Sequence, residues 1–319
     1  MDEIKITDDD LNTSVRSLAL NSELDNAGQA IYQGLSRLYD INTIKSKVLT
    51  ESDIFYFLYQ TAIGFERLIK VSHKLNKVID PNFSAGGRGH NILGLHNELV
   101  QSGKINTDST QEHFLDLLSN FLDTSTRYYN LDDRRGTAKR PRDLFLDFIN
   151  NPKIDLDKIG FNIATILKNY YELIYELSNV LNVFTYELRY DSSAAKLFYG
   201  CRIYNDIFDI FKYEDRAFGE YIIAIVSLFK KTGDLSPSGK SLLEINPIDE
   251  TIYTEIDFFE TVRELRRGSV SQDLKDIVDE LYKEMTDENR ATRGQLLSIF
   301  DSKSSEGIFR DDYYDYLDQ

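Results

Sequence analysis

Apolar residues recur at three- and four-residue spacing through most of the chain, which predicts helices. A first helix is expected from Ser22 to Asp40, after an acidic arm, residues 1–21, with at most one short helix. Thr50 and Asp53 have the spacing of a capping box, and a long apolar stripe follows them. These features predict a central helix from Thr50 to about Asn76.

Two more helices are predicted before residue 130. A glycine-rich stretch after Pro81 interrupts the chain, a helix resumes over His90–Val100, and Gly103 is expected to end it. Ser109 and Glu112 again have capping-box spacing, and the helix that they begin is expected to run towards Tyr128 and Tyr129.

The second half begins after Pro152 with a sustained apolar period that predicts one long helix over residues 155–190, about 50 Å in length. Further helices are expected at 193–212, 216–231, 255–267, 271–286 and 288–300. The segments SLLEIN and TIYTEI, around Pro247, suggest a small β hairpin. Because the chain has only five prolines and no run of alternating segments, its predicted class is all-α.

A length of 319 residues exceeds the usual size of one domain. We therefore expect two parts, a helical bundle with its N-terminal arm over residues 1–152 and a second α-helical region over residues 153–319, built on the long helix.

The charge balance restricts the classes of partner. The chain has 37 basic and 53 acidic residues, a net charge of −16, which repels polyanions and anionic membrane surfaces. Nucleic-acid binding therefore requires a local basic patch. The segment RRGTAKRPR, residues 134–142, has five basic residues in nine positions and could contact phosphates. The alternative is a solvated loop that pairs with the protein's own acidic surface.

Other features concern location and metals. The N-terminal MDEIKITDDD lacks the features of a signal peptide, and the longest apolar run, Tyr221–Phe229, is too short to span a membrane. A single cysteine, Cys201, allows no intrachain disulfide and fits a reducing compartment. His90 and His96 lie six residues apart without a further ligand nearby. We expect a cytoplasmic protein that binds no membrane, no metal and no cofactor.

Three short motifs carry a family resemblance: GFERLIK from Gly64, GHNILGLHNEL from Gly89 and RYYNLDD from Arg127. Their order resembles the HEPN family of helical domains, in which an early helix has a Glu and a Lys, the next begins with His, and a later one ends in an Arg-Tyr-like pair. The matching positions, within residues 22 to 135, are Glu66, Lys70, His90, Leu95, Arg127 and Tyr128. The alternative is an unrelated helical bundle with short matching motifs.

The resemblance implies a function without cleavage. Ribonucleases of this family use an Arg and a His four to six residues apart near the end of a late helix. The chain has this spacing at Arg67 and His73, on the central helix instead, and RYYNLDD has no His within six residues. The chain is thus more similar to the non-cleaving branch, which binds nucleotides, RNA or proteins. HEPN-like proteins with such extensions are often linked to bacterial toxin–antitoxin, abortive-infection and antiviral defence systems.

Three hypotheses follow. The first is a non-cleaving HEPN-like module that binds RNA, a nucleotide or a protein partner through Lys70, His90, Arg127, Tyr128, Arg134, Arg135, Lys139, Arg140 and Arg142. The second is a metal-independent ribonuclease that acts as a homodimer through Arg67 and His73. The third is a structural scaffold whose aromatic helices assemble with a protein partner.

Overall fold

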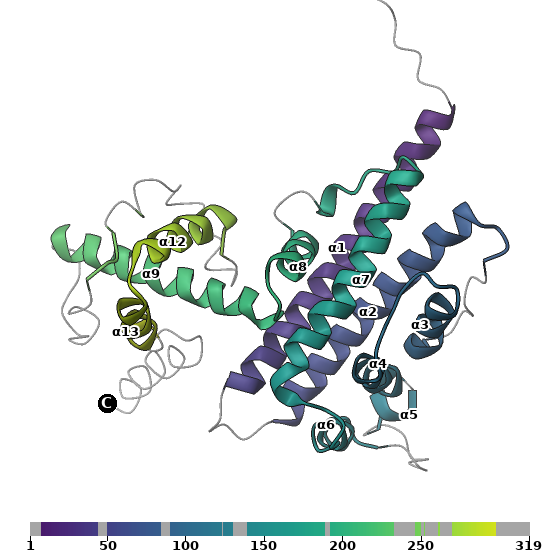
Figure 1. Cartoon of the computed structure of the whole chain (residues 1–319), viewed down its shortest axis with the longest axis horizontal. Helices are drawn as coiled ribbons and strands as arrows, with labels where there is room; N and C mark the ends of the chain where they lie inside the picture. Colours follow the sequence, from purple (N-terminus) through teal and green to yellow (C-terminus); the bar gives the residue numbers. More distant parts are fainter. Residues whose placement is uncertain are drawn as a thin grey trace, which may run out of the picture. The chain divides into compact units, whose positions relative to one another are not determined.

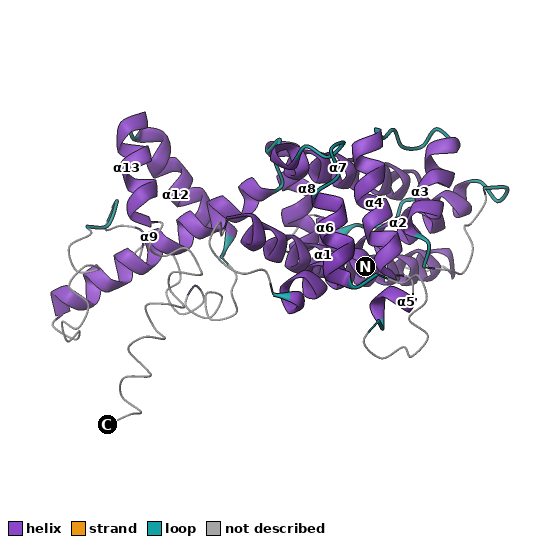
Figure 2. Ribbon diagram, turned by 90° about the horizontal axis from the view of Figure 1, so that it is seen from below, coloured by secondary structure: helices purple, strands orange, loops and turns teal. Residues whose placement is uncertain are grey.

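The computed structural model describes residues 8–43, 50–83, 90–122, 124–129, 139–188, 192–232, 246–249, 252, 261 and 270–297. Within these ranges every regular element is a helix and no strand occurs, which confirms the all-α class for the described residues (Figure 2). The expected hairpin around Pro247 and the expected helix at 255–267 fall almost entirely outside these ranges. The chain divides into two compact units, Met1–Ile210 and Phe211–Gln319.

Two long antiparallel helices, α1 (Asp8–Thr43) and α2 (Glu51–Ile79), form the centre of the first unit (Figure 1). The hydroxyl of Thr50 accepts the Asp53 amide at 3.2 Å and donates to the Asp53 carboxylate at 2.6 Å, so the predicted N-cap is confirmed. The two helices approach closely at Gly64, where an added Cβ would lie 2.8 Å from the backbone nitrogen of Ile31.

Helix α1 begins much earlier than the sequence predicts. Instead of an arm over residues 1–21, the helix is continuous from Asp8. The polar residues of its first half have partners in the loop after α7 (Ile159–Val180), because the Phe184 amide donates to the Ser17 hydroxyl and Asn21 donates to the Phe184 carbonyl. These hydrogen bonds hold the N-terminal half of α1 against the rest of the bundle.

Helix α7 is shorter than the predicted helix at 155–190 and packs against α2. It follows a 3-10 turn, η1 (Leu156–Lys158), and ends at Val180, because Asn182 has a φ of 52° in the left-handed region. A second turn, η2 (Tyr186–Leu188), leads to α8 (Ser193–Ile203), which packs on α1. The first unit therefore extends to Ile210, whereas the sequence-based division lies at residue 152.

The remaining helices of this unit gather beside α2: α3 (Ile92–Gln101), α4 (Ser109–Leu122), α5 (Thr124–Arg127) and α6 (Pro141–Ile149) (Figure 1). Gly103 ends α3 with a φ of 69°, as predicted. The carboxylate of Asp108 caps α4, one residue before the predicted cap, by accepting the amide of Gln111 at 2.9 Å. Helix α4 ends at Leu122, and α5 is the only helix described between there and Tyr129, where the predicted helix was expected to end.

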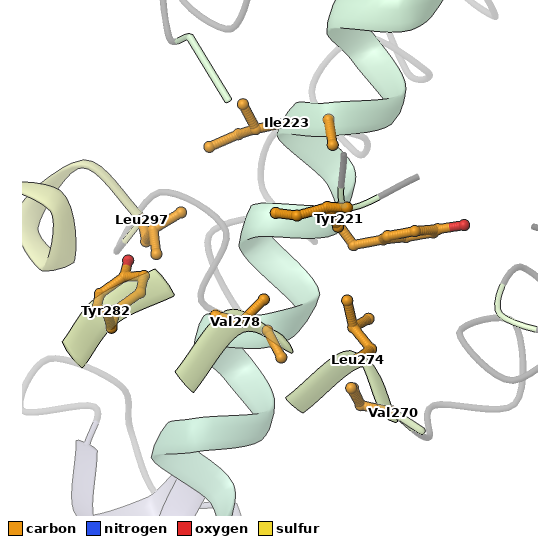
Figure 3. Close-up of a cluster of buried hydrophobic side chains, with 10 residues drawn as sticks. Tyr221, Ile223, Val270, Leu274, Val278, Tyr282 and Leu297 are labelled. Atoms are coloured by element: carbon orange, nitrogen blue, oxygen red, sulfur yellow. The ribbon is translucent and has the colours of Figure 1, made fainter. Parts of the chain in front are cut away.

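The second unit contains α9 (Phe208–Thr232), whose first residues belong to the first unit, α12 (Gln272–Glu284) and α13 (Asp287–Leu297). The predicted helix at 193–212 is divided by a break at residues 204–207, so that its first part is α8 and its last part is the start of α9. Apolar side chains from the three helices, together with Val270 just before α12, meet in one core, which includes Tyr221, Ile223, Leu274, Val278, Tyr282 and Leu297 (Figure 3). Beside this core the fully buried carboxylate of Glu220 accepts hydrogen bonds from Arg293, at 2.6 and 2.7 Å, and from Tyr282. None of the described helices is both long enough and apolar enough to cross a membrane.

Candidate ligand-binding pocket

A pocket of about 730 Å³ lies in the first unit, between α1 and α2 and bordered by α5 and by the residues after α7. Small-molecule sites typically have volumes of about 300–1,000 Å³. The pocket has aliphatic walls and a group of titratable side chains, which are Arg16, Glu23, Glu66, Arg67, Lys70, Lys74, His90 and Arg127.

The helical repeat places four of these side chains on one face of α2. Glu66, Arg67, Lys70 and Lys74 follow one another at spacings of one, three and four residues, so they lie along the same side of the helix. Because α1 runs antiparallel to α2, its N-terminal half faces the C-terminal half of α2. The contribution of α1 to the pocket therefore comes from residues 16 to 23.

Glu66 holds two of the basic side chains in position. Its side chain is only 11% exposed, and it accepts hydrogen bonds from the Nζ of Lys70 and, at 3.0 Å, from the Nδ1 of His90. Burial raises the pKa of Glu66, but the hydrogen bonds and charges of Lys70 and His90 outweigh burial, and the net pKa is lowered. The carboxylate is thus ionised at neutral pH and fixes the end of the α2–α3 connection at the pocket.

The other cations differ in their partners. Arg67 forms an ion pair with Glu23 at 2.7 Å. The guanidinium of Arg127 lies 4.8 Å from the centre of the Tyr128 ring, and its buried Nε has no hydrogen-bond partner among the described residues. Arg16 and Lys74 also have no carboxylate partner within the described ranges.

The pocket therefore has an excess of positive charge. Its lining has five Lys and Arg side chains and two carboxylates, whereas the whole chain has a net charge of −16. Such a local reversal of sign favours binding of an anion.

Three residues predicted as a binding site meet in this pocket: Lys70, His90 and Arg127. The half-exposed Tyr128 lies beside them through its contact with Arg127. The sequence-based prediction missed Arg16, Glu23 and Lys74. The first two lie in or just after the segment expected to be an arm, and the signal that would have found them is the helical continuity of α1.

The basic segment contributes no residue to the lining of the pocket among its described members. Arg134 and Arg135 lie outside the described residues. Lys139 forms an ion pair with Asp147, Arg140 lies over the Tyr129 ring at 5.5 Å, and Arg142 is exposed. Part of this segment thus interacts with the protein's own acidic and aromatic side chains.

Arg67 and His73 do not share a site within one chain. Arg67 lines the pocket, whereas His73 is buried on another face of α2, with its Nε2 at 2.8 Å from the Leu95 carbonyl and its ring beside Phe83. The ribonuclease hypothesis therefore stays a prediction that would require residues from a second copy or a rearrangement around His73.

His96 is a buried core residue, whereas the side chain of His90 is largely exposed. Its Nδ1 is hydrogen-bonded to the Tyr170 hydroxyl at 2.6 Å and its Nε2 to Thr107, and burial lowers its pKa to about 4. In the part of the chain that is described, no cluster of three His, Cys, Asp or Glu side chains has an arrangement suited to a metal ion.

Comparison of the chain with protein-family models, with curated proteins and with solved structures finds no match. The HEPN resemblance therefore stays a prediction from the three sequence motifs.

Proposed function

We propose that the chain is a non-cleaving, HEPN-like binding protein that holds a small anionic ligand in the pocket between α1 and α2. The observation that carries this proposal is Arg127, whose buried Nε lacks a hydrogen-bond partner among the described residues and lies at a pocket with excess positive charge. A buried polar group without a partner is costly, and a charge-assisted hydrogen bond to a bound anion would remove that cost.

The geometry around Glu66 supports the same proposal. Because Glu66 fixes Lys70 and His90 before any ligand arrives, the two side chains lose little freedom on binding. Fixed donors beside a cavity of about 730 Å³ suit a small molecule better than a long polyanion, which the net charge of the chain repels.

The resemblance adds more specific proposals. By itself it favours a nucleotide or RNA as the ligand, and of these two the pocket suits the nucleotide better. It also favours a homodimer or protein partner as the assembly, and a bacterial defence or toxin-type system as the setting. A structural scaffold whose aromatic helices assemble with a protein partner is the alternative to this proposal.

A matched pair of arginine variants tests the binding proposal. Arg127→Ala removes a pocket cation, and Arg142→Ala removes the same charge from an exposed position outside the pocket. Hydrogen bonds to charged groups contribute about 1.5–3 kcal/mol, so Arg127→Ala is expected to weaken binding of pyrophosphate and ATP at least about tenfold. Isothermal titration should show less than about twofold change for Arg142→Ala. Equal losses in both variants would contradict a role for the pocket.

Incubation of the protein with mixed cellular RNA in EDTA tests the absence of cleavage. The RNA is expected to stay intact with the wild type, with His73→Ala and with His90→Ala. Cleavage by the wild type that disappears in one histidine variant with an unchanged fold would replace the binding proposal with a metal-independent ribonuclease.

A further inference from the structure

The walls of the pocket change in character along α2. Nearer the N-terminus of α2, the pocket is lined by Glu66, Arg67 and Lys70, and His90 joins them through its bond to Glu66. From Val71 to Val78 the same face of the helix is mainly aliphatic. The pocket follows α2 from Ile63 to Val78, which corresponds to about 22 Å at a rise of about 1.5 Å per residue.

Three separate segments build the aliphatic end. Val71 and Leu75 of α2, Leu20 of α1 and Val183 after α7 each have less than a tenth of their surface exposed, and Val78 borders them with 42% exposed. Figure 1 shows the end of α7, which precedes Val183, well separated along the bundle from α5, which contains Arg127. Helices α1 and α2 line both ends of the pocket, whereas α5 borders the polar end and the residues after α7 border the aliphatic end.

Two basic residues lie at the aliphatic end, but their charged groups do not break the apolar wall. Arg16 and Lys74 are both exposed, so their charged groups reach water while their methylene stems can cover the pocket wall. The less exposed cations belong to the other end, and they are Arg127 and Lys70, which is paired with Glu66.

The composition of the wall indicates the kind of ligand body. Among the described residues neither Phe nor Tyr lines the pocket, although the chain has 19 Phe and 20 Tyr. Proteins commonly hold nucleobases by stacking them on aromatic rings. A wall of Leu, Val and Ile instead matches a hydrocarbon chain, which needs apolar contact without a preferred stacking plane.

Building on the anion pocket of the proposed function, and in place of the nucleotide that the resemblance favours, we propose that the ligand is a single-chain amphiphile with an anionic head group. Its carboxylate or phosphate contacts Lys70, His90 and Arg127, and its hydrocarbon tail lies along Val71, Leu75 and Val78 towards Val183. The pocket would thereby bind a fatty acid or an alkyl phosphate as a free molecule.

A series of tail lengths tests this proposal. Butyl, octyl and dodecyl phosphate, each below its micelle concentration, are titrated into the full chain, beside carboxylates of the same lengths and beside ATP. Affinity is expected to rise about fourfold per added methylene, until the tail fills the pocket. Tighter binding of the phosphate or of the carboxylate series at equal length then identifies the head group.

Two valine variants locate the tail. Val78→Asp places a charge at the aliphatic end at a position exposed enough to tolerate it, and Val180→Asp makes the same change at a position 72% exposed and outside the pocket. Val78→Asp should abolish the dependence on tail length and leave pyrophosphate binding within about twofold, and Val180→Asp should change neither.

The outcomes separate this inference from the proposed function. If ATP or pyrophosphate binds through Arg127 and dodecyl phosphate binds no tighter than butyl phosphate, the proposal of an amphiphilic ligand is wrong, and the proposal of an anion-binding pocket is retained. If none of these anions binds in a way that depends on Arg127, both proposals fail. Length dependence that survives Val78→Asp would place the tail elsewhere and overturn the inference.

Discussion

His96 shows how one buried side chain couples the stability of the fold to pH. It has none of its surface exposed and lies between the Tyr170 hydroxyl and Thr107. Burial disfavours its charged form and lowers its pKa from 6.5 to about 4. The unfolded chain therefore takes up a proton at this histidine at a higher pH than the folded chain does.

The contribution of His96 to the free energy of unfolding is therefore expected to be complete above pH 6.5 and to fall as the pH drops from 6.5 to about 4. Below pH 4 this histidine causes no further loss. The shift corresponds to about 3 kcal/mol. Urea unfolding across this range should show the loss in the wild type and a flatter profile in His96→Gln. Parallel profiles in the two proteins would assign the loss to other groups. Glu66, whose pKa is lowered, adds its own loss only below 4.5.

Single residues also show what the sequence could reveal about the pocket. Glu66 and Lys70 are four residues apart on a predicted helix, so their contact follows from local periodicity. The bond between His90 and Glu66 joins different segments, and Arg127 reaches the same pocket from α5. Periodicity contains no information about which helices pack together, so only the family resemblance placed these residues in one site.

At the scale of elements, the close approach of α1 and α2 depends on Gly64. An added Cβ would lie 2.8 Å from the Ile31 backbone nitrogen and 2.9 Å from the Ala27 carbonyl oxygen. Backbone atoms do not rotate away as a flexible side chain does, so the two helices would have to separate. The polar half of the pocket, which begins at Ile63 and Glu66, lies next to this contact.

Gly64→Ala is therefore expected to destabilise the first unit by about 1–3 kcal/mol, even though Ala favours a helix over Gly by about 1 kcal/mol. Gly294→Ala is the control, because Gly294 is helical and nothing lies within 4 Å of its added Cβ. Denaturant unfolding should show a loss for the first variant and a gain of up to about 1 kcal/mol for the second. A gain in both would mean that the helices do not depend on the glycine.

The predicted elements were most accurate where local chemistry decides their ends. Thr50 and Gly103 mark such ends, and the structure confirms both. The predictions were wrong where distant contacts decide, as at the start of α1, where Ser17 and Asn21 bond to the chain around Phe184. The early end of α7 depends on the positive φ of Asn182. Asn adopts this conformation more readily than most residues, but an Asn in the sequence does not by itself require it.

At the scale of the whole molecule, the chain has a negative net charge, whereas its pocket has an excess of basic side chains. The net charge of −16 disfavours long polyanions, while the excess of Lys and Arg in the pocket is the basis of the proposed binding of a small anion. The two units also differ from the division expected at residue 152, because α7 and α8 complete the bundle around α1 and α2. Pro152 indicated a change of element, and nothing in the local sequence showed that the next helix returns to the same core.

A crystal structure of the protein with ω-bromo-octyl phosphate tests the ligand pocket most directly, because the bromine marks the tail end unambiguously. We expect the phosphate within hydrogen-bond reach of Lys70, His90 and Arg127, and the bromine at the end of the pocket formed by Val78 and Val183. An empty pocket with the ligand bound elsewhere would contradict the proposed site. A ligand in the pocket with its bromine beside Arg127 would retain the site and contradict the assigned polarity.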